Sequence, residues 1–442
     1  MHYAGRVALG VLVAVYLALA SLYAVRTPDW QAPDEPAHYN YVRQIADEGR
    51  LPVIAPGDWQ QEYQDRLKAS RFAPELLDRL DTIQYEDHQP PLYYLLLAPV
   101  YALSGGDLPA LRLASALLGA GVVIGTWAAL RAASPGQPTL ALSGAGFVAF
   151  LPQHLSILAS VNNDALAELI VALTLWAVVV YLRGTRRIHP ATLGALAGVA
   201  LITKTTIYFL AGIVVLAVLL RGRRERWSRQ TVTMHLVAVI APALLIGGVW
   251  WGRNLYVYGG TDFTGLDRHD AVTVGQMRTD EYIEVVLGGS EQQYLENLLR
   301  TTFHSFWGQF GWMAVPLPGR VYRALEAITV GLLAGAAIYA WRGRFPRALD
   351  GPGRDVLIIF AAVIALVTAA FALYNLDFVQ FQGRYLYPAL VPLAFVVGAG
   401  LCGWTELIAG QRRIAQWLPL GAIAALALFA LYALETYLVP NL

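Results

Sequence analysis

Apolar stretches of about 18 residues or more recur along the whole sequence, and each is long enough to cross a bilayer as a helix. Backbone groups in lipid must find their hydrogen bonds inside a helix or a closed barrel, and the short alternating segments of a barrel are missing. The sequence therefore predicts an all-α polytopic membrane protein. Only 14% of the 442 residues are charged, against about a quarter in soluble domains. A net charge of +1 gives no indication of nucleic-acid binding.

The first apolar run, residues 7–25, has the length of a membrane span. The segment Ala18–Ala20 resembles a signal-peptide cleavage site, but the run is longer than a typical signal-peptide core and many spans follow it. We therefore expect this segment to be kept as a signal anchor.

Arginines predict the orientation, because short cytoplasmic loops of membrane proteins are enriched in basic residues. The clusters are Arg183, Arg186 and Arg187; Arg221, Arg223, Arg224, Arg226 and Arg229; Arg342, Arg344 and Arg347; and Arg412 and Arg413. Placing all of them inside puts the N-terminus inside and the C-terminus outside. The eleven spans expected are 7–26, 108–131, 138–158, 164–182, 190–203, 206–220, 231–251, 321–341, 355–373, 386–404 and 414–435.

Two large loops then lie on the outer side, residues 27–107 and 252–320. Within the first, residues 36–49 and 59–80 have the pattern of helices lying along the membrane surface. Residues 90–103 are apolar but short. Counting them as a full span would move the arginine clusters outside, so we expect a partial or interfacial helix there.

Unusual polar residues gather at the outer boundary of these spans, although they come from distant parts of the chain. They are Asp34 and Glu35, Asp87 and His88, Asn162, Asn163 and Asp164, Lys204, Arg253, and Arg384 with Tyr385. Ionisable residues at a membrane edge are costly, and function is their default explanation. Carboxylates and cations on a single face are what an active-site cleft requires.

Each position also has a simpler explanation. Asp34 and Glu35 are placed to cap a surface helix, and Asp164 to cap the next span. Lys204 is placed to extend toward the headgroups, and Arg253 and Arg384 lie beside interfacial aromatics. These explanations do not account for the fact that all of these residues are expected on the same side of the membrane.

Several motifs resemble those of a known superfamily. The segments PDEPAHYNYVRQIADEGRLPV, HQPPLYYLL, LRLASALLGAGVV, VNNDALAEL and LITKTT follow one another in this order. In order and spacing they resemble the GT-C superfamily of integral-membrane glycosyltransferases, which includes protein O-mannosyltransferases and the aminoarabinose transferase of lipid A. The later segments SFWGQFGWM and FQGRYLYPALVPLAF resemble a bacterial subgroup of predicted membrane proteins.

The resemblance implies a fold and a reaction. Residues 1–255 would form a conserved transmembrane module that includes the first outer loop, 27–107. Residues 256–320 would form the second outer loop, and 321–442 the variable C-terminal helices. The reaction would transfer a sugar, with inversion, from a polyprenyl-phosphate donor to a glycan, lipid or protein acceptor. It would take place on the extracytoplasmic side of the cytoplasmic membrane, among membrane lipids.

The resemblance also implies roles for the acids. Asp34 matches the loop acid that acts as general base or organises the acceptor and a metal, and Asp164 matches the acid of the second outer loop. We include Glu35 among the catalytic candidates. A divalent cation, Mg²⁺ or Mn²⁺, would bind Asp34 and Asp164. The second loop carries Asn-Asn-Asp rather than Asp-x-Asp, a departure that argues against protein asparagine as acceptor and against an obligatory metal.

The cations suit the donor, because a phosphate leaving group needs positive charge beside it. Lys204 matches the superfamily position that holds the donor phosphate, and Arg384 and Arg253 are further candidates. His88 matches a position where relatives have lysine or histidine before two prolines. The predicted substrate-binding residues are His88, Asn163, Tyr93 and Tyr385.

A transporter or flippase of lipid-linked glycans is the alternative. It would require polar residues along a path through the whole membrane, or repeat symmetry. The polar residues lie at one boundary and no internal repeat is visible, so the sequence favours the glycosyltransferase.

Overall fold

The computed structural model describes residues 2–342, 351–409 and 417–442. Helices dominate this part of the chain. The strands described in it, β1 (Gln309–Phe310) and β2 (Val315–Pro316), pair as one small antiparallel hairpin. The predicted all-α polytopic fold is confirmed.

Nine helical segments in the described ranges are long and apolar enough to span a membrane. They are α1 (His2–Arg26), α5 (Leu108–Ala133), α8 (Asp164–Arg183), η2 with α10 (Thr205–Ile207, Phe209–Arg224), α11 (Arg229–Tyr258), α15 (Gly319–Trp341), α16 (Gly351–Asp377), η4 with α17 (Gly383–Ala389, Leu390–Ala409), and α18 with η6 and η7 (Leu418–Ala433, Leu434–Leu438, Val439–Asn441). A tenth span arises if α6 (Pro138–Phe150) and α7 (Pro152–Leu158), which meet at 66°, are counted as one broken helix.

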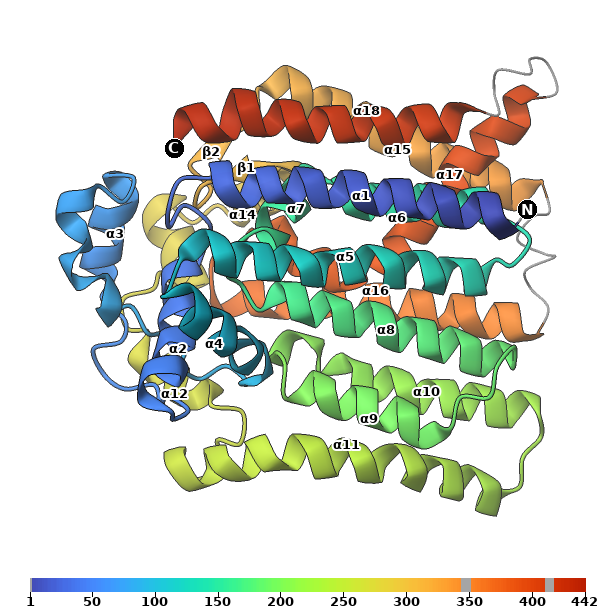
Figure 1. Ribbon diagram of the computed structural model, residues 1–442, viewed down its shortest axis with the longest axis horizontal. Coiled ribbons are helices and arrows are strands. Elements are labelled where there is room, and N and C mark those ends of the chain that lie inside the picture. The colour runs from blue at the N-terminus through green and yellow to red at the C-terminus, as the bar shows by residue number, and fades with distance from the viewer. Residues whose placement is uncertain (1, 343–350, 410–416) are drawn as a thin grey trace.

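The predicted count of eleven spans is not confirmed, because α9 (Pro190–Leu201) has only 12 residues. A helix of that length rises about 18 Å, well short of the roughly 30 Å hydrocarbon core. Even so, α9 runs back along the bundle beside α10 and α11 (Figure 1). The N- and C-termini lie at opposite ends of the bundle, as the predicted topology requires.

Close packing against α11 holds the short helix α9. A Cβ atom added at Gly194 would come within 2.1 Å of the carbonyl oxygen of Val239, and one at Gly198 within 2.8 Å of Ile246. Small residues of this kind let membrane helices approach closely, and packing is what drives their association in lipid.

We expect Gly194→Leu to destabilise the protein by at least about 1–3 kcal/mol, the usual cost of overpacking. The matched control is Gly212→Leu on α10, where an added Cβ would have no neighbour within 4 Å. Thermal unfolding in one detergent measures both variants. Equal midpoints for the two would contradict this account of the α9–α11 contact.

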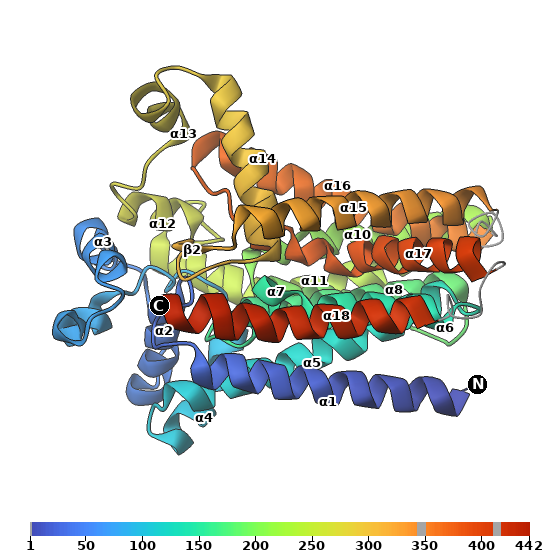
Figure 2. The ribbon, with the colours of Figure 1, turned by 90° about the horizontal axis from the view of Figure 1, so that it is seen from above.

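The helices outside the spans gather at one end of the bundle, where the C-terminus also lies (Figures 1 and 2). They are α2 (Glu35–Glu48), α3 (Gln61–Ala69), η1 (Pro74–Thr82), α4 (Leu92–Ser104), α12 (Leu266–Val272), α13 (Thr279–Glu281), η3 (Tyr282–Val286) and α14 (Glu291–Trp307). The helix expected over 36–49 is therefore present. The one expected over 59–80 is divided into α3 and η1, since Arg71 and Phe72 adopt positive φ between them.

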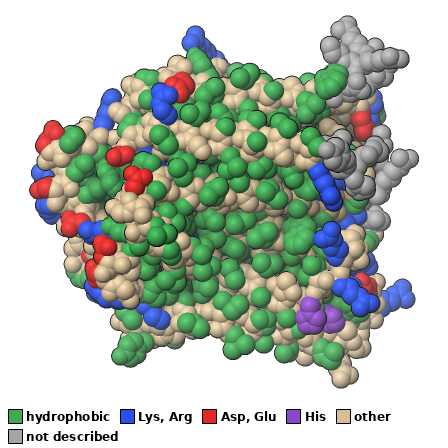
Figure 3. Space-filling view, viewed as in Figure 1, with side chains coloured by type: hydrophobic (Ala, Val, Ile, Leu, Met, Phe, Trp, Pro, Cys, Tyr) green, Lys and Arg blue, Asp and Glu red, His purple; other side chains and the backbone are tan. Residues whose placement is uncertain are grey.

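Helix α4 has 13 residues and lies beside α2 at this end, which suits the partial helix expected over 90–103 (Figure 2). The loops after α8 and α10, which carry two of the arginine clusters, lie at the opposite end. Most acidic side chains visible in Figure 3 lie at the end of the surface helices, and hydrophobic side chains cover the middle. Arg344, Arg347, Arg412 and Arg413 are outside the described residues.

Candidate active site

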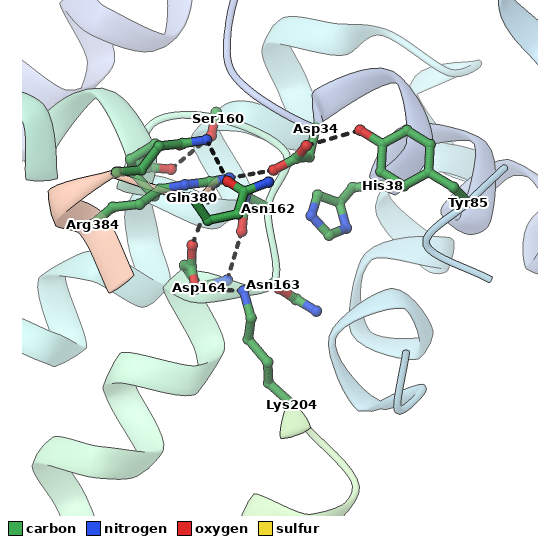
Figure 4. A network of polar contacts seen from close by, with 12 residues as sticks. Asp34, His38, Tyr85, Ser160, Asn162, Asn163, Asp164, Lys204, Gln380 and Arg384 are labelled. Carbon is green, nitrogen blue, oxygen red and sulfur yellow. Dashed lines mark hydrogen bonds and ion pairs between the residues drawn. The ribbon is translucent and has the colours of Figure 1, made fainter. Parts of the chain in front are cut away.

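Polar side chains from four separate segments meet at the end of the bundle that carries α2. Asp34 precedes α2, Asp164 opens α8, Lys204 lies between α9 and η2, and Arg384 belongs to η4. Their side chains point toward one another in Figure 4. The structure thus brings together these four predicted site residues, although the contacts alone do not test their chemical roles.

Asp34 contacts both another residue of the first outer loop and Arg384 in the C-terminal half. Its Oδ1 accepts a hydrogen bond from the Tyr85 hydroxyl at 2.8 Å, and its Oδ2 accepts one from the Arg384 guanidinium. The carboxylate makes no capping bond to α2, so the helix-cap explanation is wrong for Asp34. Burial by itself would raise the pKa of Asp34, but the positive charge of Arg384 and the neighbouring His38 lower it to about 2. Asp34 is therefore a carboxylate at neutral pH.

Glu35, the next residue, faces a different partner. It forms a fully buried, two-pronged ion pair with Arg112 of α5, with Nη2–Oε2 at 2.6 Å and Nε–Oε1 at 2.8 Å. The backbone amide of Val161 also donates to Oε1 at 3.1 Å. Both oxygens are thus occupied, and the geometry gives no support to the catalytic role predicted for Glu35. No role was predicted for Arg112 from the sequence, although it lies in the segment LRLASALLGA.

Asp164 is held by two cations. Lys204 Nζ lies 2.5 Å from Oδ1, and Arg384 Nη1 lies 3.8 Å from Oδ2. Arg384 therefore stands between Asp34 and Asp164, with one nitrogen toward each. Opposite charges balance within this group of four, which is how buried ions are usually accommodated.

The divalent cation predicted to bind Asp34 and Asp164 does not fit this arrangement. The Arg384 guanidinium occupies the position between the two carboxylates that a cation would need. In the described ranges no group of three or more histidine, cysteine or acidic side chains could hold a metal ion. No step proposed below uses a metal.

A row of aromatic side chains forms another side of the site. His38 Nδ1 lies 2.8 Å from the Tyr94 hydroxyl, which also receives a hydrogen bond from Asn163 at 3.2 Å. Tyr41 stacks on Tyr94 with ring centroids 3.7 Å apart. Burial, together with the charge of Lys204, lowers the pKa of His38 to about 3, so the imidazole is neutral at pH 7. No sequence pattern predicted a role for His38 or Tyr94.

Tyr93 and Arg253 are not part of this cluster. The Tyr93 hydroxyl pairs with Ser115 at 2.7 Å inside the core, whereas its neighbour Tyr94 contacts His38. Arg253 donates to Asn254 at 3.0 Å and to the carbonyl of Pro52. These contacts do not support a substrate role for Tyr93 or a phosphate role for Arg253.

His88 and Tyr385 border the cluster. The His88 ring packs 4.2 Å from the ring of His269, which links the first outer loop to α12. The Arg384 guanidinium lies 5.4 Å from the ring centre of Tyr385. Tyr385 is thus placed beside the site, as predicted, and His88 beside the second outer loop.

Several buried polar atoms around the cluster have no hydrogen-bond partner among the described residues. They are Arg384 Nε, Asn162 Nδ2, Asn163 Oδ1, Glu86 Oε2 and Gln89 Oε1. Buried polar groups are nearly always paired, and an unpaired one costs about 1–3 kcal/mol. Several such atoms around one cluster of charges are free to bond to water or to a polar ligand. Glu86 and Gln89 were missed from the sequence.

Comparison with solved structures agrees with this architecture. The oligosaccharyltransferase of Archaeoglobus fulgidus, tethered with an acceptor peptide containing the NVT sequon, superposes with a TM-score of 0.56 at 13% identity, over 98% of this chain and 54% of that one. The same protein in complex with Zn and sulfate gives a TM-score of 0.54 at 13% identity, over 96% and 52%. ArnT from Cupriavidus metallidurans, bound to undecaprenyl phosphate, gives 0.49 at 14% identity, over 97% and 73%.

The chain therefore shares the fold of the Archaeoglobus fulgidus oligosaccharyltransferase, in line with the resemblance of its sequence motifs. The chain spans about half the length of the oligosaccharyltransferase that it matches. Among curated proteins, none matches the sequence. Residues 82–394 match the family described as "Predicted membrane protein (DUF2142)", and the chain belongs to this family.

Proposed function

We propose that the protein is a membrane glycosyltransferase that moves a sugar from a polyprenyl-phosphate donor to an acceptor. The acceptor is a glycan, a lipid or a protein, and the anomeric carbon is inverted. The site lies on the extracytoplasmic side of the cytoplasmic membrane, opposite the arginine-rich loops. The observation that carries the proposal is the meeting of Lys204 and Arg384 with two carboxylates and with unpaired donors at one end of a GT-C fold.

The donor phosphate binds on the side of the cations. Arg384 Nε and Asn162 Nδ2 are unpaired hydrogen-bond donors. Lys204 belongs to the same cluster because it bonds to Asp164. Phosphate oxygens accept hydrogen bonds from guanidinium and ammonium groups strongly. When the bond between sugar and phosphate breaks, negative charge grows on the phosphate, and preorganised cations stabilise it.

The lipid tail lies between the spans. An apolar cavity of about 670 Å³ opens among α6, α15, α17 and α18, and Trp307 and Phe147 are among its lining residues. Trp307 packs near Phe306, which contacts Tyr387 of η4 at 5.5 Å between ring centres. The cavity is thus joined by a short chain of aromatic contacts to the helix that carries Arg384, which supports its use by a polyprenyl chain.

The acceptor approaches from the side of Asp34. Inversion in one step requires attack from the face opposite the leaving phosphate, so the acceptor and the cations must lie on different sides of the sugar. Asp34 acts there as a general base, or it orients the acceptor through its carboxylate.

The test uses the full chain in nanodiscs with a panel of radiolabelled undecaprenyl-phosphate sugars and candidate acceptors. We expect Lys204→Gln to lower kcat/KM by about a hundredfold, the usual cost of removing one group that stabilises developing charge. Arg50→Gln serves as the matched control, because Arg50 is exposed in the first outer loop and pairs only locally with Glu48. Unchanged transfer in Lys204→Gln would refute the phosphate assignment. Movement of labelled lipid across the bilayer with its sugar bond intact would favour the flippase instead.

A further inference from the structure

Glu86 is a partly buried acid beside the site, and the arrangement described so far does not use it. It lies between Tyr85, whose hydroxyl bonds to Asp34, and Asp87, both of whose oxygens accept from Gln44 at 3.1 and 2.9 Å. Glu86 Oε2 is buried and has no hydrogen-bond partner in the described part of the chain. A carboxylate oxygen without a partner at this position can accept a hydrogen bond from a bound substrate.

The other acids near the cluster are poor candidates for taking a proton. Glu35 is neutralised by Arg112, and Asp164 by Lys204. Both carboxylate oxygens of Asp34 already accept hydrogen bonds, one from Tyr85 and one from Arg384. A carboxylate that is stabilised by an ion pair and by hydrogen bonds is a weak base, because protonation must give up those interactions.

We propose that Glu86 is the catalytic base that takes the proton from the acceptor hydroxyl. This assignment rests on the proposed transferase function. In the step, the acceptor oxygen forms its bond to the anomeric carbon while the bond from that carbon to the phosphate oxygen breaks. The bonding pair stays on the phosphate, and the acceptor proton passes to a Glu86 oxygen, from which water later removes it. Asp34 then serves to orient the acceptor and to hold Arg384 in place.

The surroundings of Glu86 suit this role. The charged and titratable groups that act on it are Asp34 before α2, Lys204 before η2, Arg384 in η4, its neighbour Asp87, Tyr85, Tyr94 of α4 and Tyr374 of α16. Burial and the negative charge of Asp34 raise the pKa of Glu86 to about 7, although Lys204, a hydrogen bond from the Gln89 side chain and Arg384 act in the opposite direction. A base whose pKa lies near the working pH is the most effective one.

The test compares Glu86→Gln with the wild-type chain in nanodiscs, over pH 5 to 9, in the same transfer assay. A base must be ionised, so the wild-type kcat should rise with pH through about 7 and then level off. Glu86→Gln should lower kcat by about a hundredfold and remove that rise. Binding of undecaprenyl phosphate should be unchanged, which also shows that the variant is folded. Glu75→Gln is the control, because Glu75 lies exposed on η1.

A second variant keeps the assignment testable if Glu86→Gln does not fold. Glu86→Asp retains a carboxylate on a shorter arm, so it should keep the pH-dependent rise at a lower kcat. Transfer by Glu86→Gln at the wild-type rate would refute the role of Glu86 and leave the transferase standing. Absence of transfer by the wild-type chain with every donor would refute the transferase itself, and the base with it.

Discussion

Replacing Arg112 by alanine should destabilise the protein by about 3–5 kcal/mol, because it leaves the Glu35 carboxylate buried without a counter-charge. Arg112 and Glu35 side chains are only 1% and 0% exposed. Arg112 also donates to the carbonyls of Ala24 and Thr27, at 3.2 and 2.7 Å, where α1 ends. One side chain therefore ties α1, α2 and α5 together below the site, and its loss leaves several buried acceptors unpaired.

Thermal and denaturant unfolding in a fixed detergent would measure this effect. The control is Arg26→Ala, because Arg26 pairs with Glu435 at the surface, where the two side chains are 47% and 39% exposed. Exposed pairs contribute about 0–1 kcal/mol. Equal losses in the Arg112 and Arg26 variants would contradict the structural role of the buried pair.

The double variant Glu35→Gln/Arg112→Met separates structure from catalysis. Removing both charges should recover much of the stability lost in Arg112→Ala, because no unpaired charge stays buried. Since the Glu35 oxygens face Arg112 and Val161 rather than the site, the double variant should keep sugar transfer. A folded but inactive double variant would restore the catalytic role predicted for Glu35 from the sequence.

The convergence of Asp34, Asp164, Lys204 and Arg384 could be predicted from the sequence because a membrane protein has only two faces on which the ends of its spans can lie. Once the arginine loops give an orientation, each polar residue at a span end falls on one face or the other. Four residues spread over the chain could therefore be placed together without any knowledge of helix packing.

The orientation could not show that two residues adjacent in the sequence have different partners. Asp34 and Glu35 point to different partners because Asp34 adopts a left-handed backbone, with φ at 66°, just before α2 begins. Tyr93 and Tyr94 differ because consecutive residues of a helix point about 100° apart, so one enters the core and the other the site. Sequence patterns do not contain these local directions.

Glu86 was missed for a related reason. In the segment YEDHQPPL it resembles a solvated loop acid beside Asp87. The charged groups that act on it, Asp34, Lys204 and Arg384, come from distant parts of the chain. The predicted number of spans also depended on packing that the sequence does not show. The glycines of α9 allow a helix of 12 residues to stay inside the bundle.

Replacing Arg384 by alanine should reduce sugar transfer by about a thousandfold, the upper range for the loss of one charge-stabilising donor. Arg384 is 6% exposed and contacts both Asp34 and Asp164. Without it, two partly buried carboxylates are left with Lys204 as the remaining cation of the cluster. The pKa of Asp34 should then rise from about 2, since burial raises it and the main opposing charge has been removed.

The measurement separates loss of charge from loss of fold. Arg384→Lys keeps one positive charge but not the two-pronged contact, so it should recover only part of the activity. Arg278→Ala is the control, because Arg278 pairs with Asp270 in the second outer loop and both side chains are largely exposed. Binding of undecaprenyl phosphate should weaken in Arg384→Ala and be unchanged in Arg278→Ala. If Arg384→Ala bound the lipid phosphate as tightly as the wild-type chain, the donor would have to sit elsewhere, and Arg384 would only hold the two acids in place.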